Sequence, residues 1–448
     1  MMIRRTRTIY ILAIVIATVI ILHLLNPADS VQYHSQIIRS FKQQISSINP
    51  FSSHELSESG GYIIKPNNVQ FKFTNPKQRS TEPKHIILEN AKRYKELLSQ
   101  PINEPKDATL MRPPSNFATY KRANATLLAL VKNQEAAAIG ASLRQIHNRF
   151  NSKFKYPITL LNDKPFTDNF IRKMSRYIPE EIEVEYVTIP KQLWDKPDNI
   201  DLKRETHEMD LMEKHDIAYA KKQSYHNMCR FYSGNIYNVP ELQKYKYYWR
   251  IEPGINYFTD INYDVFRYLE DTGKIYGFTI SLYDIEESIK TLWPETLNYL
   301  NKDNNYKYID TNGSFQWLVE DLQNPQKNKV AGGYSTCHFW SNFEIADMDF
   351  FRGDAYNNWF KYLDSTGKFY YERWGDAPVH SIGVSLFADK KKIHWFRDIG
   401  YFHDPYFNCP NTPTSQNCEI GKFSLWEHLN KENCLMNWVD YEMTPNVY

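Results

Sequence analysis

Residues 245–264 read YKYYWRIEPGINYFTDINYD, and the start of this stretch decides the fold. From Tyr245 to Ile251 the chain is aromatic and β-branched, and Pro253-Gly254 follows almost at once. An apolar run that stops at such a turn predicts a buried strand. Glu252 then lies at the carboxyl end of that strand, where open α/β sheets bind their ligands. Its carboxylate is either a turn-capping acid or a seat for a divalent metal that holds a diphosphate.

The chain before this strand alternates between strand-like and helix-like patterns. Buried strands are predicted for ATLLALV (125–131), PITLLN (157–162) and IEVEYV (182–187). Between the first two, apolar residues from Ile139 to Phe150 recur at helical spacing. This alternation predicts an α/β fold with a parallel sheet, whose first loop, at Lys132-Asn133, faces a nucleotide. No GxGxxG or GxxxxGK[ST] occurs, so neither a dinucleotide-binding nor a P-loop fold is indicated.

The N-terminus carries a pattern typical of a membrane anchor. Arginines at positions 4, 5 and 7 precede an apolar run from Ile9 to Leu25. Positive charge before the run places residues 1–8 in the cytosol and makes 9–25 a transmembrane signal anchor. A cleaved signal peptide is the alternative, but no small-residue cleavage site closes the run. The bulk of the chain is then expected to be lumenal.

A polar segment separates the predicted anchor from the strand–helix pattern. Residues 26–115 are rich in Ser, Asn, Gln and Lys, with scattered prolines, and are predicted to form a lumenal stem. A short helix is expected from about Lys84 to Leu98. The catalytic domain is predicted to span residues 116–448.

The composition of the chain restricts the kinds of partner that it is expected to bind. The 448-residue chain has a formal net charge of +2, so a nucleic-acid partner is not indicated. Aromatic residues make up 15% of the chain, which suits either a sugar-binding surface or an aromatic core.

The 5 cysteines fit an oxidising compartment and show no metal-type CxxC spacing. Cys409 and Cys418 bracket a short polar loop and are the first choice for a disulfide. Pairing among Cys229, Cys337 and Cys434 stays open, and one thiol is left over.

From residue 224 onward, several long motifs accumulate. They are SYHNMCRFYSG (224–234), YYWRIEP (247–253), YSTCHFWSNFEI (334–345), YERWGDAPVHSIGVSLF (371–387) and IHWFRDIGYFHDPYFNCP (393–410). Together these motifs closely resemble the fungal α-1,2-mannosyltransferases of the KRE/KTR/MNT type, glycosyltransferase family 15. The resemblance covers roughly residues 125–418.

This resemblance implies a GT-A type, Rossmann-like nucleotide-sugar transferase fold. It further implies that mannose is transferred from GDP-mannose, with Mn2+ as cofactor and with retention at the anomeric carbon. The acceptor is expected to be a mannose of an N- or O-linked glycoprotein glycan. A type II protein of the Golgi membrane is implied as well.

The resemblance also assigns a metal site. Glu252 matches the family's metal-binding carboxylate, and His403 matches its second ligand. An imidazole beside a carboxylate favours Mn2+ over Mg2+. Several family members carry Glu-Pro-Asp where this chain has Glu252-Pro253-Gly254, so one acidic group is missing here.

The remaining site residues are assigned by the same resemblance or by their place in the motifs. Glu344 matches the proposed nucleophile, acting by double displacement or by front-face stabilisation of an oxocarbenium-like state. Tyr225 matches a tyrosine beside the donor diphosphate, and Lys132 is expected to contact the nucleotide. Arg230 is either a phosphate partner or a structural ion pair.

Two more residues, Trp374 and Asp376, are candidates for positioning the acceptor. A literal Asp-x-Asp at Asp347-Met348-Asp349 lacks a preceding apolar strand and is interpreted as structural.

Two alternative functions stay open. A mannosylphosphate transferase of the same family would show nearly the same motifs. A non-catalytic subunit of a glycosylation complex is the other, against which Glu252, Glu344 and His403 argue.

Overall fold

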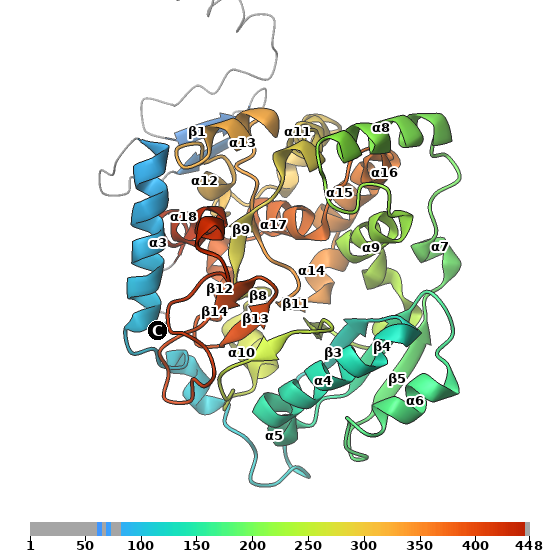
Figure 1. Ribbon diagram of the computed structural model, residues 1–448, viewed down its shortest axis with the longest axis vertical. Helices are drawn as coiled ribbons and strands as arrows, with labels where there is room; N and C mark the ends of the chain where they lie inside the picture. Colours follow the sequence, from blue (N-terminus) through green and yellow to red (C-terminus); the bar gives the residue numbers. More distant parts are fainter. Residues whose placement is uncertain (1–60, 65–68, 73–81, 444–448) are drawn as a thin grey trace, which may run out of the picture. The chain divides into compact units, whose positions relative to one another are not determined.

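The computed structural model describes residues 61–64, 69–72 and 82–443 (Figure 1). The expected cytoplasmic tail and the expected anchor at 9–25 lie outside the described residues, as does most of the expected stem. Strands β1 (Gly61–Ile64) and β2 (Val69–Lys72) pair antiparallel. No helix within the described ranges is long and apolar enough to span a membrane.

A seven-stranded mixed sheet organises the domain, in the order β12-β8-β11-β6-β3-β4-β5. Strands β3 to β6 run parallel, whereas β11 lies antiparallel to both β6 and β8, and β12 is parallel to β8. The α/β fold and the predicted parallel strands are therefore confirmed, and the sequence missed the antiparallel β11. The strands are β3 (Ala125–Leu130), β4 (Ile158–Asn162), β5 (Val184–Thr188), β6 (Tyr247–Arg250), β8 (Tyr276–Phe278), β11 (Glu344–Asp347) and β12 (Ile393–Trp395).

Helices cover the sheet. Its central strands, β3, β4 and β6, are therefore buried along almost their whole length. Near β3–β5, α4 packs against α6. Toward the other end of the chain, α17 packs against α9 and β10. The helices from α4 to α10 are α4 (Ala136–Ile146), α5 (Ser152–Phe154), α6 (Asp168–Met174), α7 (Lys191–Trp194), α8 (Leu202–Lys214), α9 (Gln223–Ser233) and α10 (Val265–Thr272).

The second half of the chain adds shorter helices and two small sheets. The sheets pair β9 (Ser281–Tyr283) with β10 (Cys337–Phe339), and join β7 (Asn256–Tyr257), β13 (Tyr401–His403) and β14 (Tyr406–Asn408). The helices are α11 (Leu292–Asn301), α12 (Phe315–Leu318), α13 (Pro325–Val330), α14 (Met348–Arg352), α15 (Asp354–Ser365), α16 (Lys368–Tyr371), α17 (Asp376–Phe387) and α18 (Leu435–Tyr441).

Helix α3 (Pro83–Ser99) packs on the C-terminal part of the domain and matches the short helix expected in this segment. The Tyr94 hydroxyl donates a hydrogen bond to the Phe407 carbonyl at 2.9 Å, and both groups are buried. Residues 82–115, assigned above to the stem, are therefore part of the folded domain. The polar composition did not indicate this packing, because a helix needs only one apolar face to bury a few side chains against a domain.

The aromatic richness of the chain belongs mainly to the core. Seven tryptophans are among the largest fully buried side chains, namely Trp249, Trp293, Trp317, Trp359, Trp374, Trp395 and Trp438. Burial of such rings stabilises the domain through both apolar area and edge-to-face contacts. The aromatic content of the chain alone therefore does not indicate a sugar-binding surface.

One apolar run of the sequence forms two strands. The apolar run from Tyr276 to Leu282 becomes β8 and β9, separated by Thr279-Ile280. The division arises because β8 pairs in the main sheet with β11 and β12, whereas β9 leaves it to pair with β10. Periodicity cannot report a change of pairing partner.

Two disulfides are present in the described domain. The predicted Cys409–Cys418 bond is confirmed, and the second joins Cys337 to Cys434. Cys229 is the free, buried thiol. The Cys337–Cys434 bond closes a sequence separation of 97, against 9 for the other, and it fixes the start of β10 to the start of α18.

Removing the long-range disulfide is expected to cost more stability than removing the short one. Cross-linking lowers the entropy of the unfolded chain by more when the loop is longer, which corresponds to about 4–5 kcal/mol for a loop near 100 residues and less than 3 for a short one. Urea unfolding of Cys337→Ala/Cys434→Ala should therefore show a larger loss than that of Cys409→Ala/Cys418→Ala. An equal or reversed order would contradict this account.

Candidate active site

The site is built at the end of β6, the strand quoted at the outset. Arg250 is its last residue and is buried, and Glu252 follows two residues later. Gly254 then has φ of +82°, and its amide donates a hydrogen bond to Ser142 Oγ at 3.1 Å. This left-handed turn sends the chain away from the sheet and leaves Glu252 at its edge.

The strand end opens into a cleft of about 540 Å³. Its lining comes from α9, the turn after β6, β9, β10, the start of α17 and the β13–β14 hairpin. The lining residues include Tyr225, Glu252, Trp340, Asp376 and His403. A smaller pocket of about 150 Å³ lies at the ends of β3 and β4 and includes Lys132 and Asn162. The two cavities share Tyr225, Met228 and Glu252. Glu252 therefore stands at their junction.

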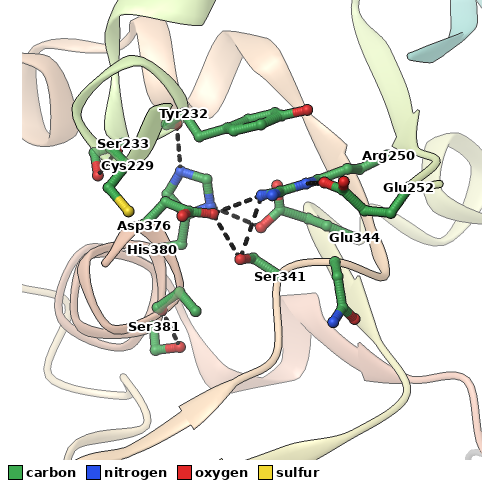
Figure 2. Close-up of polar contacts among 12 residues, drawn as sticks. Cys229, Tyr232, Ser233, Arg250, Glu252, Ser341, Glu344, Asp376, His380 and Ser381 are labelled. Atoms are coloured by element: carbon green, nitrogen blue, oxygen red, sulfur yellow. Dashed lines mark hydrogen bonds and ion pairs between the residues drawn. The ribbon is translucent and has the colours of Figure 1, made fainter. Parts of the chain in front are cut away.

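The cleft floor is a buried cation between two carboxylates, shown in Figure 2. Arg250 Nε donates to Glu252 Oε1 at 2.6 Å, and its Nη1 donates to Asp376 Oδ2 at 2.5 Å. The Tyr232 ring lies over the guanidinium, 3.6 Å from its Cζ to the ring centroid. Burial opposes charge on Asp376, but the adjacent Arg250 outweighs it and lowers the pKa of that carboxyl. Asp376 is thus held ionised on the cleft surface.

Glu344 lies in a second, wholly buried layer of polar groups. Its carboxylate accepts hydrogen bonds from the hydroxyls of Tyr248 and Tyr276, the latter at 2.7 Å. His380 Nδ1 lies 2.7 Å from Glu344 Oε2 (Figure 2). Burial opposes charge on His380, but Glu344 and its hydrogen bond outweigh this and raise the pKa of the imidazole.

This placement bears on the role expected for Glu344. Its side chain is 0% exposed, and it does not line the cleft. Both of its oxygens are used by neighbouring donors. The role of nucleophile stays a prediction, whereas Asp376 is the carboxylate that the structure presents to the cleft.

The predicted metal ligands are brought together. Glu252 and His403 both line the cleft, although they are far apart in sequence. Burial lowers the pKa of His403, which keeps the imidazole neutral and able to ligate. Trp340 packs edge-on against the His403 ring at 5.2 Å. A carboxylate and a neutral imidazole that face one cleft could both ligate a divalent metal ion.

The two residues predicted to contact the nucleotide, Tyr225 and Lys132, both line the smaller pocket. Lys132 stands directly after β3. Tyr225 also faces the larger cleft, where its hydroxyl accepts a hydrogen bond from Arg373 Nη1 at 3.3 Å. The strand-end position foreseen for Lys132 is the one observed.

Two predicted site residues lie elsewhere. Arg230 forms a two-point ion pair with Asp364, with Nε 2.6 Å from Oδ1, and lines neither cavity. Of the two roles left open for it, the structure supports the structural ion pair. Trp374 is 0% exposed and donates its indole N–H to Glu372 at 2.8 Å, so its ring does not reach the cleft and cannot hold an acceptor there.

The Asp-x-Asp sequence has the structural role that was predicted, but the reason given for it was wrong, because the buried strand β11 does precede it. Asp347 ends β11 and caps α14, accepting a hydrogen bond from the Asp349 amide at 2.9 Å. Neither carboxylate lines the cleft.

Arg250, His380 and Arg373 belong to the site but were not predicted from the sequence. A charged residue inside the strand YYWR was the available signal for Arg250, because a buried charge requires a partner. His380 and Arg373 gave no comparable signal, since their partners lie far away in the sequence.

Known proteins of similar sequence are mannosyltransferases. The profile of the family described as glycolipid 2-alpha-mannosyltransferase matches residues 84–443. Probable mannosyltransferase KTR4 of Saccharomyces cerevisiae is 46% identical over 368 residues, which cover 81% of this chain and 78% of that protein. O-glycoside alpha-1,2-mannosyltransferase homolog 3 of Schizosaccharomyces pombe is 42% identical over 294 residues, 66% of this chain and 75% of the relative.

Solved structures agree with the sequence relatives. The X-ray structure of S. cerevisiae Ktr4p in complex with GDP has a TM-score of 0.79 and 45% identity, over 83% of this chain and 95% of that one. Core-mannan synthase A of Aspergillus fumigatus, in a Mn/GDP form, has a TM-score of 0.74 and 43% identity, over 78% and 94%. The fold is that of an α/β glycosyltransferase. The chain belongs to the glycolipid 2-alpha-mannosyltransferase family, glycosyltransferase family 15.

A side chain at position 254 is expected to destabilise the turn. Because φ is +82° and nothing lies within 4 Å of an added Cβ, the cost is conformational alone. Gly254→Ala should lower the free energy of unfolding by about 1 kcal/mol, and Gly254→Asp by somewhat less, since aspartate tolerates positive φ better. Urea unfolding measures both. Two variants as stable as the wild type would show that the turn does not require a left-handed residue.

Removing the buried imidazole should destabilise the domain in a pH-dependent way. His380→Gln leaves Glu344 without its cation, which typically costs about 3–5 kcal/mol. Because the pKa of His380 is raised in the folded state, its contribution is complete below about 6.5, the unfolded value, and declines as pH rises through the folded value. Unfolding free energies at several pH values should therefore differ most at acidic pH. His428→Gln, on the surface, is the control, and a difference that grows with pH would contradict the ion pair.

Proposed function

We propose that the protein transfers mannose from GDP-mannose to a mannose residue of a protein-linked glycan, in α-1,2 linkage and with retention. The observation that carries this proposal is the two-part cleft, with Glu252 at the junction of its two cavities. A nucleotide in the smaller cavity places its diphosphate at that junction and the sugar in the larger one. The X-ray structure of the relative Ktr4p in complex with GDP supports a donor that carries GDP.

The residues around the junction have different roles in binding the donor. In this proposal Lys132 and Tyr225 contact the nucleotide and its diphosphate, and Glu252 and His403 hold the metal. Bound Mn2+ would supply positive charge that stabilises the leaving diphosphate. The Mn/GDP form of core-mannan synthase A supports the choice of metal. The proposed GT-A type of the fold agrees with a donor held in this way.

The floor of the larger cavity suits a transition state with positive charge at the anomeric carbon. Asp376 is ionised and fixed by Arg250 and by Ser341 Oγ at 2.7 Å. A fixed negative charge stabilises developing positive charge without having to reorganise. Glu344 and His380 lie directly behind this floor and hold it in place. Asp376 therefore acts on the sugar, and Glu344 contributes from the buried layer through its pair with His380.

We further propose that the protein is a type II membrane protein of the Golgi with its catalytic domain in the lumen. The apolar run at 9–25 and the arginines before it support this orientation. Two disulfides in the domain fit an oxidising compartment.

The topology can be tested in sealed microsomes. The domain should resist added protease until detergent is present, because the membrane separates it from the cytosol. Immunoblotting against the C-terminal part measures this. Digestion of the intact domain without detergent would exclude the proposed orientation.

Loss of either metal ligand should abolish donor turnover. Glu252→Ala and His403→Ala are each expected to lower kcat for GDP-mannose by about 100-fold or more, since each removes an electrostatic contact to the departing diphosphate. Arg230→Lys is the control: it weakens the ion pair with Asp364 but should leave the KM for GDP-mannose unchanged. Mn2+-dependent turnover of all proteins is measured with methyl α-mannoside as acceptor.

The products of this assay separate the candidate functions. Released GDP and an α-1,2-linked dimannoside support the proposal, whereas released GMP would identify a mannosylphosphate transferase. No turnover and no response to Mn2+ in the wild-type protein would favour a non-catalytic subunit.

A further inference from the structure

One imidazole in the larger cavity has no part in the site described so far. His338 is the middle residue of β10, lines the cleft, and is only 3% exposed. It pairs with Leu282 of β9, which lines the cleft as well. A nearly buried polar ring that faces a substrate cavity needs a physical explanation.

The hydrogen bonds of His338 fix its tautomer. Nδ1 lies 3.2 Å from the Thr336 carbonyl oxygen, which can only accept, so Nδ1 carries the proton. Burial lowers the pKa of His338, which keeps the ring neutral. Nε2 is then an unprotonated acceptor, and no residue of the described domain donates a hydrogen bond to it at usual distances.

Thr336 holds this arrangement in a conformation that is rare for its residue type. Its φ is +66°, which is unfavourable for a β-branched residue. Its carbonyl accepts from the Asp284 amide at 2.9 Å, and its hydroxyl donates to the Asp284 carbonyl at 3.2 Å. The next residue, Cys337, is fixed by the disulfide to Cys434. Backbone strain that is held from both sides in this way is typical of functional positions.

The surroundings of His338 suit a sugar. Trp340 follows two residues later on the same face of the chain, about 7 Å further along. Trp340 in turn contacts His403, with ring centroids 5.2 Å apart. The cleft wall thus runs from the metal site over an aromatic ring to a hydrogen-bond acceptor.

We propose that His338 accepts, through Nε2, a hydrogen bond from a hydroxyl group of the acceptor mannose and thereby selects the acceptor. This inference rests on the proposed function, since it concerns the second substrate of that reaction. Hydroxyl recognition by a fixed, desolvated acceptor is selective, because an analogue that lacks the hydroxyl leaves the acceptor atom unpaired.

The first test separates the acceptor from the donor. His338→Leu should lower kcat/KM for methyl α-mannoside by roughly 10- to 100-fold, the usual effect of leaving one buried partner unpaired. Hydrolysis of GDP-mannose without acceptor, and its KM, should stay within about twofold of wild type. His338→Gln, whose side-chain oxygen can also accept, should recover part of the loss. His428→Gln, an exposed histidine outside the cleft, is the matched control.

The second test uses the substrate instead of the protein. The 3-, 4- and 6-deoxy forms of methyl α-mannoside retain the hydroxyl at which an α-1,2 bond forms. Wild-type enzyme should discriminate against one of them by roughly 10- to 100-fold. His338→Leu should treat that form and the parent mannoside alike, because the contact is already absent.

The outcomes distinguish this inference from the proposed function. A wild-type enzyme indifferent to all three deoxy forms overturns the inference, even if His338→Leu does not fold. So does an equal loss of donor hydrolysis and transfer with a lowered Tm in His338→Gln, which would indicate a structural role. A wild-type protein that neither hydrolyses nor transfers from GDP-mannose would overturn the proposed function and the inference with it.

Discussion

The site depends on one buried cation. Arg250 ends the central strand β6 and is paired with Glu252 and Asp376 beneath the ring of Tyr232. A guanidinium in this environment is stable only while its partners stay in place, because an unpaired buried charge is costly. The pairing therefore ties the end of β6, the start of α17 and the end of α9 to a single point. Glu252 is held at the junction of the two cavities for the same reason.

Behind Arg250, negatively and positively charged side chains alternate with increasing distance from the cleft. Asp376 is the first residue of α17, where the helix dipole favours an anion, and His380 follows one turn later on the same face. His380 then pairs with Glu344, whose carboxylate is also bound by Tyr248 and Tyr276. One helix thus supplies both the carboxylate of the cleft floor and the cation of the buried layer. Such a floor is preorganised, which suits the transfer of an uncharged sugar through a charged transition state.

Arg230 and Trp374 were predicted to belong to the site but lie elsewhere, and the reason differs between the two. Tyr225 and Arg230 share the motif on α9, but five residues on a helix turn through about 140° relative to each other, so both cannot face one cleft. Tyr225 faces the cavities, and Arg230 pairs with Asp364 on another side. Trp374 precedes α17 and packs against Phe369 with ring centroids 5.5 Å apart. Helical geometry could have excluded Arg230, whereas only the packing could place Trp374.

The sequence by itself determined the parallel strands, the seat of Glu252 at the end of β6, the Cys409–Cys418 bond and the membership of the family. These depend on local periodicity, short loops and long motifs, all of which can be read along the chain. Only the tertiary structure decided which charges share the cleft. Arg250 and Asp376 are 126 residues apart, and Glu344 and His380 meet near them only because α17 packs against α9 and β10. A pattern in the sequence reports that a residue is polar or buried, but the partner of a buried charge is chosen by the packing of helices on the sheet.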